Sequence, residues 1–228
     1  GQKRTEFAIP ERIAKQLDNM KPHREKLAFE KIAKKVNTSW KLWTLLNPLK
    51  VTKYNINNMS GDLDIVLAYN PSILRYFKSS AKDLWNYQIM KKAPTKELLE
   101  AIRKGVLDSG LTLEEIPELR NDAILDEVMG TKKMNPARKF WNKTKEITLW
   151  RENTLRLAAY RHFKEAVKEK KNLYAASRKD EIEAITDLDD KAAKLSRELI
   201  GDYGNISKAG QWLREHMMPF YSWIEVSN

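Results

Sequence analysis

The stretch from Pro136 to about Lys171 constrains the fold most, because it contains no glycine and no proline after its first residue. It permits a helix of about 35 residues, roughly 50 Å long. One side of this helix carries Phe140, Ile147, Thr154 and Ala158. Another side carries Leu149, Tyr160, Phe163 and Val167. A helix with two such sides can be buried on both, so we predict a central helix surrounded by others.

The rest of the chain also reads as helical. Its 228 residues include only 8 Gly and 8 Pro, below the usual shares of about 7% and 5%. We therefore expect an all-α, irregular multi-helix bundle around the central helix (136–171), with few or no strands. Residues 1–130 form an N-terminal helical region of no recognised family and residues 131–228 a C-terminal one; one continuous domain is the alternative.

An apolar stripe runs along the N-terminal helix, which we expect to open at Pro22 and to end before Pro48. Its members recur at spacings of three and four residues, which places them on one side of a helix. They are Phe29, Ile32, Val36, Trp40 and Trp43. A stripe of this width is typical of a core seam, so we interpret both tryptophans as structural.

Turn and cap residues divide the remaining chain. An irregular connection is expected over 48–61 and a polar hinge over 130–136. Thr112 with Glu115 forms a capping box. We predict helices over 62–69, 71–77, 80–90, 95–109 (capped by Thr95 and ended by Gly110), 112–130, 182–200 (ended by Gly201) and from Ser207 onward.

Four charged residues occur within the predicted central helix: Arg151, Glu152, Arg156 and Arg161. Glu152 precedes Arg156 by four residues, the favourable order for a helical ion pair. A charged side chain on an apolar side must be paired or must reach water. We favour a buried polar network that fixes how neighbouring helices pack, and the alternative is an anion-binding cluster.

Most catalytic and metal-binding signatures are missing. There is no Cys and only three His, and no zinc-protease, P-loop, dinucleotide or nucleophile-elbow motif occurs. We interpret His162 and Glu165, one H-x-x-E pair, as surface residues. We therefore expect no enzyme, no cofactor and no metal site; a hydrolase with dispersed carboxylates is the residual alternative. No stretch reaches the roughly 18 apolar residues of a membrane span, and the start at Gly1 carries no signal peptide, so we expect a piece of a longer protein.

The net charge of +11 belongs to two stretches: residues 1–47 carry 11 basic and 5 acidic side chains, and residues 131–180 carry 15 and 5. Such a field favours a polyanion, although it also serves solubility. The alternative function is therefore a basic helical nucleic-acid-binding domain that uses Lys132, Lys133, Arg138, Lys139, Lys143 and Lys145 against phosphates. The terminal aromatic residues Phe220, Tyr221 and Trp223 form a candidate interface, with membrane-surface docking as a weaker idea.

Several short motifs in residues 136–228 resemble a known family. Arg151-Glu-Asn-Thr-Leu-Arg156-Leu-Ala-Ala-Tyr160 looks like the signature R-E-x-x-x-R-x-A-x-Y of one large polyvalent protein-associated domain of bacteriophages and mobile elements. Ala192-Ala-Lys-Leu-Ser-Arg197, Gly201-Asp-Tyr-Gly-Asn-Ile-Ser207 and Pro219-Phe-Tyr-Ser-Trp223 look like its second block.

The resemblance implies a non-catalytic helical structural or interaction module of a large multi-domain protein, packaged in virions or delivered with DNA into the host cytoplasm. Its partners would be other domains of the parent protein or virion proteins. Combined with the residue patterns, it leads to a structural polar network. In that network Arg151, Glu152, Arg156 and Tyr160 join the central helix to the turn at Asp202 and Tyr203 and to the aromatic C-terminal end.

Overall fold

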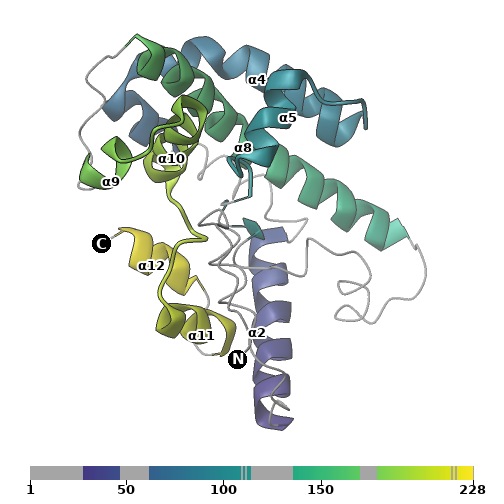
Figure 1. The fold of residues 1–228 in the computed structure, drawn as a ribbon. Helices are drawn as coiled ribbons and strands as arrows, with labels where there is room; N and C mark the ends of the chain where they lie inside the picture. The colour runs from purple at the N-terminus through teal and green to yellow at the C-terminus, as the bar shows by residue number, and fades with distance from the viewer. Residues whose placement is uncertain are drawn as a thin grey trace, which may run out of the picture.

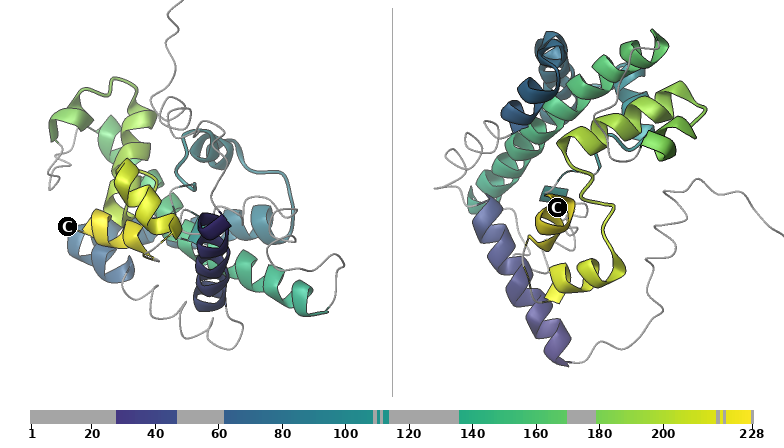
Figure 2. Two further views of the ribbon diagram at one scale, coloured as in Figure 1. Left: turned by 90° about the horizontal axis from the view of Figure 1, so that it is seen from below. Right: turned by 90° about the vertical axis from the view of Figure 1, so that its left-hand side faces the viewer.

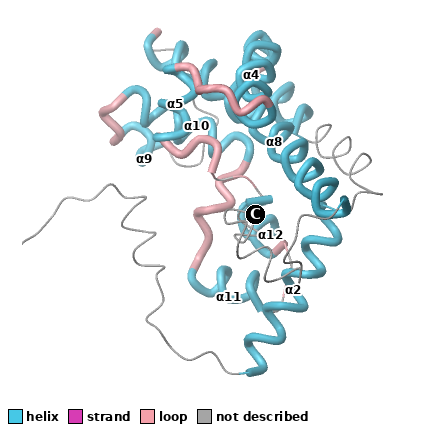
Figure 3. Tube along the Cα trace, turned by 90° about the vertical axis from the view of Figure 1, so that its right-hand side faces the viewer, coloured by secondary structure: helices cyan, strands magenta, loops and turns pink. Residues whose placement is uncertain are grey.

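The computed structural model describes residues 28–46, 62–108, 110, 112–113, 136–169, 179–216, 218 and 220–227. Within these ranges the chain is all-α and contains no strand (Figure 3). The predicted fold class is therefore confirmed. The expected connection over 48–61, the hinge residues before Pro136 and most of the predicted 112–130 helix lie outside the described residues.

The central helix is α8 (Pro136–Lys168), close to the predicted 136–171. It packs against α10 (Leu188–Ile200) on one side, and against η1 (Pro71–Tyr76) and α4 (Phe77–Leu84) on another (Figure 1). Every residue from Arg151 to Phe163 is buried, so the helix is enclosed on all sides along this part. α8 packs against helices from both sides of the predicted boundary between residues 130 and 131. The division of the chain into two regions at this boundary stays a prediction.

The helices predicted over 71–77 and 80–90 are one continuous helical segment, which corrects the break expected between them. The 3₁₀ helix η1 begins at Pro71, where the Asn70 side chain accepts a hydrogen bond from Ser72 N at 2.9 Å. It runs into α4 and then into η2 (Trp85–Ile89), a π-helix. No glycine or proline interrupts this segment after Pro71, so nothing in its sequence ends a helix there.

Cap residues set the bounds of the shorter helices. Thr95 caps α5 (Lys96–Arg103) as predicted, and Asp187 caps α10. Gly201, at φ 94°, ends α10 as predicted. The predicted end of α5 at Gly110 is wrong, because Gly105 already adopts a left-handed φ of 70° and the helix stops at Arg103.

The predicted helix over 182–200 is interrupted. A short α9 (Lys179–Glu183) precedes α10. The chain then continues into α11 (Lys208–His216), where Ser207 Oγ accepts a hydrogen bond from Gly210 N at 2.9 Å, and α12 (Tyr221–Ser227). α11 packs against α2 (Ala28–Leu46), and α12 packs against α11, away from α4, α5 and α10, as Figure 2 shows.

The orientation of α2 contradicts the predicted core seam. Ile32, Val36, Trp40 and Trp43 are between 48% and 64% exposed, and we call them the α2 apolar face. The buried side carries Asn37, Thr38, Lys41 and Leu42 instead. The burial pattern therefore reverses the usual amphipathic arrangement of a packed helix.

Hydrogen bonding explains why the polar side of α2 is held inward. Asn37 Nδ2 donates to Arg214 O at 2.8 Å and to Glu215 O at 3.0 Å, and Lys41 Nζ donates to Arg214 O at 2.8 Å. These carbonyls belong to the last turn of α11, where no intrahelical donor is left for them. Asn37 and Lys41 thus cap α11, and the apolar side stays largely exposed, with Trp40 in contact with Phe220.

Candidate functional site: charged residues buried along α8

Arg161 lies in the middle of α8 and is buried. Its Nη2 atom donates to Asp83 Oδ2 at 2.6 Å, and its Nε atom donates to Glu97 Oε2 at 3.0 Å. Its Nη1 atom donates to the hydroxyls of Ser79 and Ser80 at 3.0 and 3.1 Å. One guanidinium therefore joins α8 to both α4 and α5, and its hydrogen-bonding capacity is used within the protein.

A second cluster joins α8 to α5 and α10. The buried Tyr160 donates its hydroxyl to Glu100 Oε1 at 2.6 Å. Lys164 Nζ lies 2.6 Å from the same oxygen and 3.1 Å from Asp189 Oδ1. Burial raises the pKa of Tyr160, and the bond to Glu100 raises it further. The phenol therefore stays protonated and acts as a donor.

The charge of Glu100 is stabilised by the same contacts. Burial by itself raises the pKa of a carboxyl group. The hydrogen bonds from Lys164 and Tyr160 outweigh this effect and lower the pKa of Glu100. In the opposite sense, burial would lower the pKa of Lys164, but its bonds to Glu100 and Asp189 raise it. Both groups are held in their charged forms.

Arg156 is fully buried and reaches the end of α10. Its Nη2 atom donates to Gly201 O at 3.0 Å. Its guanidinium carbon lies 6.0 Å from the centre of the Tyr203 ring, and burial raises the pKa of that tyrosine. Arg156 thus satisfies a carbonyl at the α10 terminus, where a cationic donor is favoured.

Arg151 and Glu152 begin the buried part of α8. Arg151 Nη1 lies 2.9 Å from Asp62 Oδ2. Burial raises the pKa of Asp62, and the charge of Arg151 opposes this shift. Glu152 is buried beside Gly110, and its Oε2 atom has no hydrogen-bond partner within the described part of the chain. Glu152 and Arg156 form no ion pair among the described residues, although their spacing suggests one.

The predicted network and the observed contacts overlap in part. Arg156 reaches the turn after α10 through Gly201 and Tyr203, as the hypothesis requires. Asp202 instead lies 3.5 Å from Arg197 Nε. Tyr160 bonds to α5 rather than to this turn.

The contacts between helices were not predicted, because no local spacing signals a contact between residues that are 25 (Lys164 and Asp189) to 89 (Asp62 and Arg151) positions apart. The residues absent from the prediction are Asp62, Ser79, Ser80, Asp83, Glu97, Glu100, Lys164 and Asp189.

His162 is buried, which corrects its interpretation as a surface residue. Its ring packs against Phe163 at 5.5 Å and lies near Asn70 Nδ2 at 3.4 Å. Glu165 is exposed and accepts a hydrogen bond from the Tyr76 hydroxyl. Burial and this bond raise the pKa of Tyr76 to about 12. Both residues of the pair therefore contact Tyr76, whose ring centre lies 6.4 Å from that of His162 and whose hydroxyl bonds to Glu165.

The residues predicted to bind nucleic acid are only partly described. Lys143 is exposed and Lys145 half-buried. Lys132 and Lys133 lie outside the described residues, as do the side chains of Arg138 and Lys139. Of the candidate interface, Phe220 packs on Trp40 with ring centres 5.5 Å apart, Tyr221 is half-buried, and the Trp223 side chain is not described.

Within the described ranges no group of three or more side chains is arranged to hold a metal ion. None of the helices described there combines the length and apolar character needed to cross a membrane. Comparison of the chain with protein families, curated proteins and solved structures finds no match. The resemblance to a polyvalent protein-associated domain therefore stays a proposal.

Proposed function

We propose that the chain is a non-catalytic structural and interaction module of a large multi-domain protein of a bacteriophage or mobile element. The observation that carries the proposal is the saturation of Arg161 by Asp83, Glu97 and two serines. A buried cation whose donors all bond to the protein joins helices and has little capacity left for a substrate. Such a module holds neighbouring parts of a larger assembly in place, in a virion or in the host cytoplasm after delivery.

The α2 apolar face supplies the interaction surface in this proposal. Exposed apolar side chains grouped on one helix mark a docking site more often than isolated ones do. On the same helix Lys35 is exposed and Lys34 half-buried, whereas Lys41 is buried, and the chain as a whole has a net charge of +11. We therefore assign the face to an acidic protein surface with an apolar centre, provided by another domain of the parent protein or by a virion protein.

Photo-crosslinking in the full-length parent protein tests this assignment. A photoreactive phenylalanine derivative replaces Trp43, and a matched one replaces the exposed Lys78 of α4. We expect position 43 to crosslink to an acidic segment of another domain or virion protein, and position 78 to give background only. Equal crosslinking from both positions, or crosslinks only between two copies of α2, would contradict the proposal.

Nucleic-acid binding is the second candidate, and the exposed Lys143 with Lys145 in the first half of α8 favours it. If lysines contact phosphates, affinity for a random duplex should fall by about 10³-fold or more between 50 and 200 mM salt for six or more contacts. A filter-binding titration over this salt range measures the slope. No binding at low salt would remove this candidate.

A further inference from the structure

Phe220, in the turn between α11 and α12, has a left-handed φ of 65°. A positive φ is uncommon outside glycine and is an outlier for a bulky residue, whereas glycine adopts this backbone without strain. Hydrogen bonds on both sides hold the turn: Met218 N donates to Leu213 O at 2.8 Å, and Tyr221 N donates to Met218 O at 3.2 Å. The surrounding structure therefore fixes a strained residue, which is typical of sites where strain serves a function.

The ring of Phe220 supports Trp40 on α2. The two ring centres lie 5.5 Å apart and the planes are inclined by 53°, which is a favourable arrangement for an aromatic pair. Asn37 and Lys41, on either side of Trp40 in the sequence, bind the end of α11 and so hold the turn after it beside α2. Trp40 is nevertheless 48% exposed. The contact thus restricts the indole ring without covering it.

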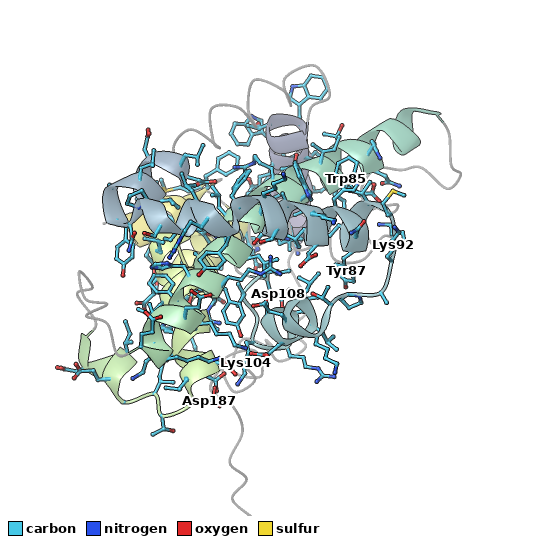
Figure 4. The ribbon with its side chains drawn as sticks, turned by 90° about the horizontal axis from the view of Figure 1, so that it is seen from above. Trp85, Tyr87, Lys92, Lys104, Asp108 and Asp187 are labelled. Atoms are coloured by element: carbon cyan, nitrogen blue, oxygen red, sulfur yellow. The ribbon has the colours of Figure 1, made fainter. Side chains whose placement is uncertain are left out.

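A second exposed tryptophan shows what is particular about Trp40. Trp85 on η2 is 41% exposed, and its ring packs edge-on against Trp150 with the centres 5.6 Å apart. Figure 4 shows Trp85 near Tyr87 and Lys92. Trp150 belongs to the regular helix α8, so this contact needs no strained backbone. Single exposed apolar side chains are common on protein surfaces, but Trp40 belongs to the α2 apolar face and its support is a strained residue.

The spacing of the α2 apolar face indicates how it meets a partner. Val36, Trp40 and Trp43 stand at positions i, i+4 and i+7, the pattern by which one side of a helix enters an apolar groove. Tryptophan is enriched among the few interface residues that contribute most of the binding energy, and these residues fill pockets. A side chain that is already held in place loses less conformational freedom on binding. The exposed Lys35 on the same helix favours an acidic rim around the groove.

From these observations we infer that Trp40 is the anchor residue of the α2 apolar face and that Phe220 is a positioning residue, which holds the indole ready for a pocket of the partner protein. The pocket is apolar, fits an indole ring and has an acidic rim. This inference rests on the proposed function, because it names how the same face binds its acidic partner. Phe220 acts through Trp40 and turns a strained backbone into a preformed binding group.

Fluorine NMR of the whole chain labelled with 5-fluorotryptophan tests the positioning role. Trp40→Phe assigns the Trp40 resonance. Phe220→Gly removes the supporting ring, so we expect this resonance to move towards its position in the urea-denatured chain. Phe220→Tyr keeps a ring and should leave the resonance in place. The matched control is His216→Ala, which removes the ring stacked on Trp212 and should move the Trp212 resonance but not that of Trp40.

The urea midpoint tests whether the backbone of Phe220 is strained. Phe220→Gly and Phe220→Ala both lose the ring, but only glycine relieves the left-handed φ. The glycine variant should therefore have the higher urea midpoint of the two. A higher midpoint for the alanine variant would show that the ring is not held by a strained residue and would overturn the inference.

Crosslinking from position 43 in the full-length parent protein tests the anchor role. We expect the yield to fall about two- to tenfold in Phe220→Gly, the loss expected when one side chain must be ordered on binding. Phe220→Tyr and His216→Ala should keep the yield of the unmodified chain. An equal yield in Phe220→Gly, or an unmoved Trp40 resonance, overturns this inference and leaves the proposed function standing. A crosslink that is already absent without any change at Phe220 contradicts both, so the two failures are distinguishable.

Discussion

The middle of α8 and the outer side of α2 reverse the usual distribution of polar and apolar residues. On α8, Arg156 and Arg161 are buried, whereas on α2 the side chains of Trp40 and Trp43 are about half exposed. Hydrophobicity alone predicts the opposite. In this protein, therefore, the burial of a side chain depends on hydrogen-bond and ion-pair partners on neighbouring helices, and not only on low polarity.

The partners differ in kind between the two regions. On α8 the guanidinium groups find carboxylates, hydroxyls and a helix-terminal carbonyl on three other helices. On α2 the inward polar residues find the last carbonyls of α11. Substitutions that remove a partner should therefore destabilise the fold, and substitutions on the α2 apolar face should not.

The largest effect is expected for Arg161→Met. The change leaves Asp83 and Glu97 without their common partner, and removing one member of a buried pair costs about 3–5 kcal/mol. Because both carboxylates keep some contact with water, we expect a loss near the lower end, about 3 kcal/mol, in urea unfolding. Arg75→Met, at an exposed arginine of η1, is the control and should stay within about 0.5 kcal/mol. Equal losses in both variants would contradict the role of Arg161.

Gly201→Ala should give the next largest effect. The φ of 94° strains any residue with a Cβ atom, and that atom would lie 2.8 Å from the Tyr203 ring. We expect a loss of about 2 kcal/mol, from the left-handed backbone and the displaced ring together. Thermal unfolding monitored by circular dichroism measures it. The exposed Gly204, which has no left-handed φ, is the matched control, and a Gly204→Ala variant that is equally unstable would refute this explanation.

Glu100→Gln should show how much of the acid sensitivity comes from the Tyr160 and Lys164 cluster. The folded-state pKa of Glu100 is lowered, so its contribution is present above the unfolded pKa of about 4.3 and is lost as the pH falls through the folded pKa. We expect the variant to lose about 1 kcal/mol at pH 7. It should also show a smaller drop in urea midpoint between pH 7 and pH 3 than the unmodified protein. The exposed Asp180, changed to Asn, is the control. An unchanged pH profile in Glu100→Gln would show that this carboxylate is not coupled to folding.

The smallest effect is expected on α2. Trp43→Ala removes a large side chain that is 55% exposed, and we expect the free energy of unfolding to change by less than about 0.5 kcal/mol. Leu42→Ala, at the neighbouring buried position, should cost about 2–3 kcal/mol. Urea unfolding of both variants gives the comparison. If Trp43→Ala is the more destabilising of the two, the α2 apolar face is part of the core after all.

The sequence predicts the helices and their ends better than it predicts the contacts between the helices. The absence of glycine and proline from residues 137–168 is enough to predict α8, and Thr95 and Gly201 mark helix ends by local chemistry alone. Such signals act within four residues of each other. They were sufficient for the all-α class and for most helix boundaries.

The orientation of α2 and the partners of Arg161 depend on distant helices. Periodicity identified the stripe that contains Trp40 and Trp43, but it cannot tell whether a packed neighbour offers apolar groups or unpaired carbonyls. Likewise the charge of Arg161 is evident from the sequence, while Asp83 and Glu97 belong to separate helices. No single-sequence pattern connects them, so these features had to come from the structure.

Hydrogen exchange measured by mass spectrometry tests the central claim most directly, that the buried charges of α8 fix the packing of its neighbours. In the unmodified chain the amides of residues 151–163 should exchange only through global unfolding and be the slowest in the described part of the protein. In Arg161→Met, protection should fall in α4 and α5 as well as in α8, while α2 keeps its own exchange rates. Fast exchange of residues 151–163 in the unmodified chain, or a loss confined to α8 in the variant, would contradict the account.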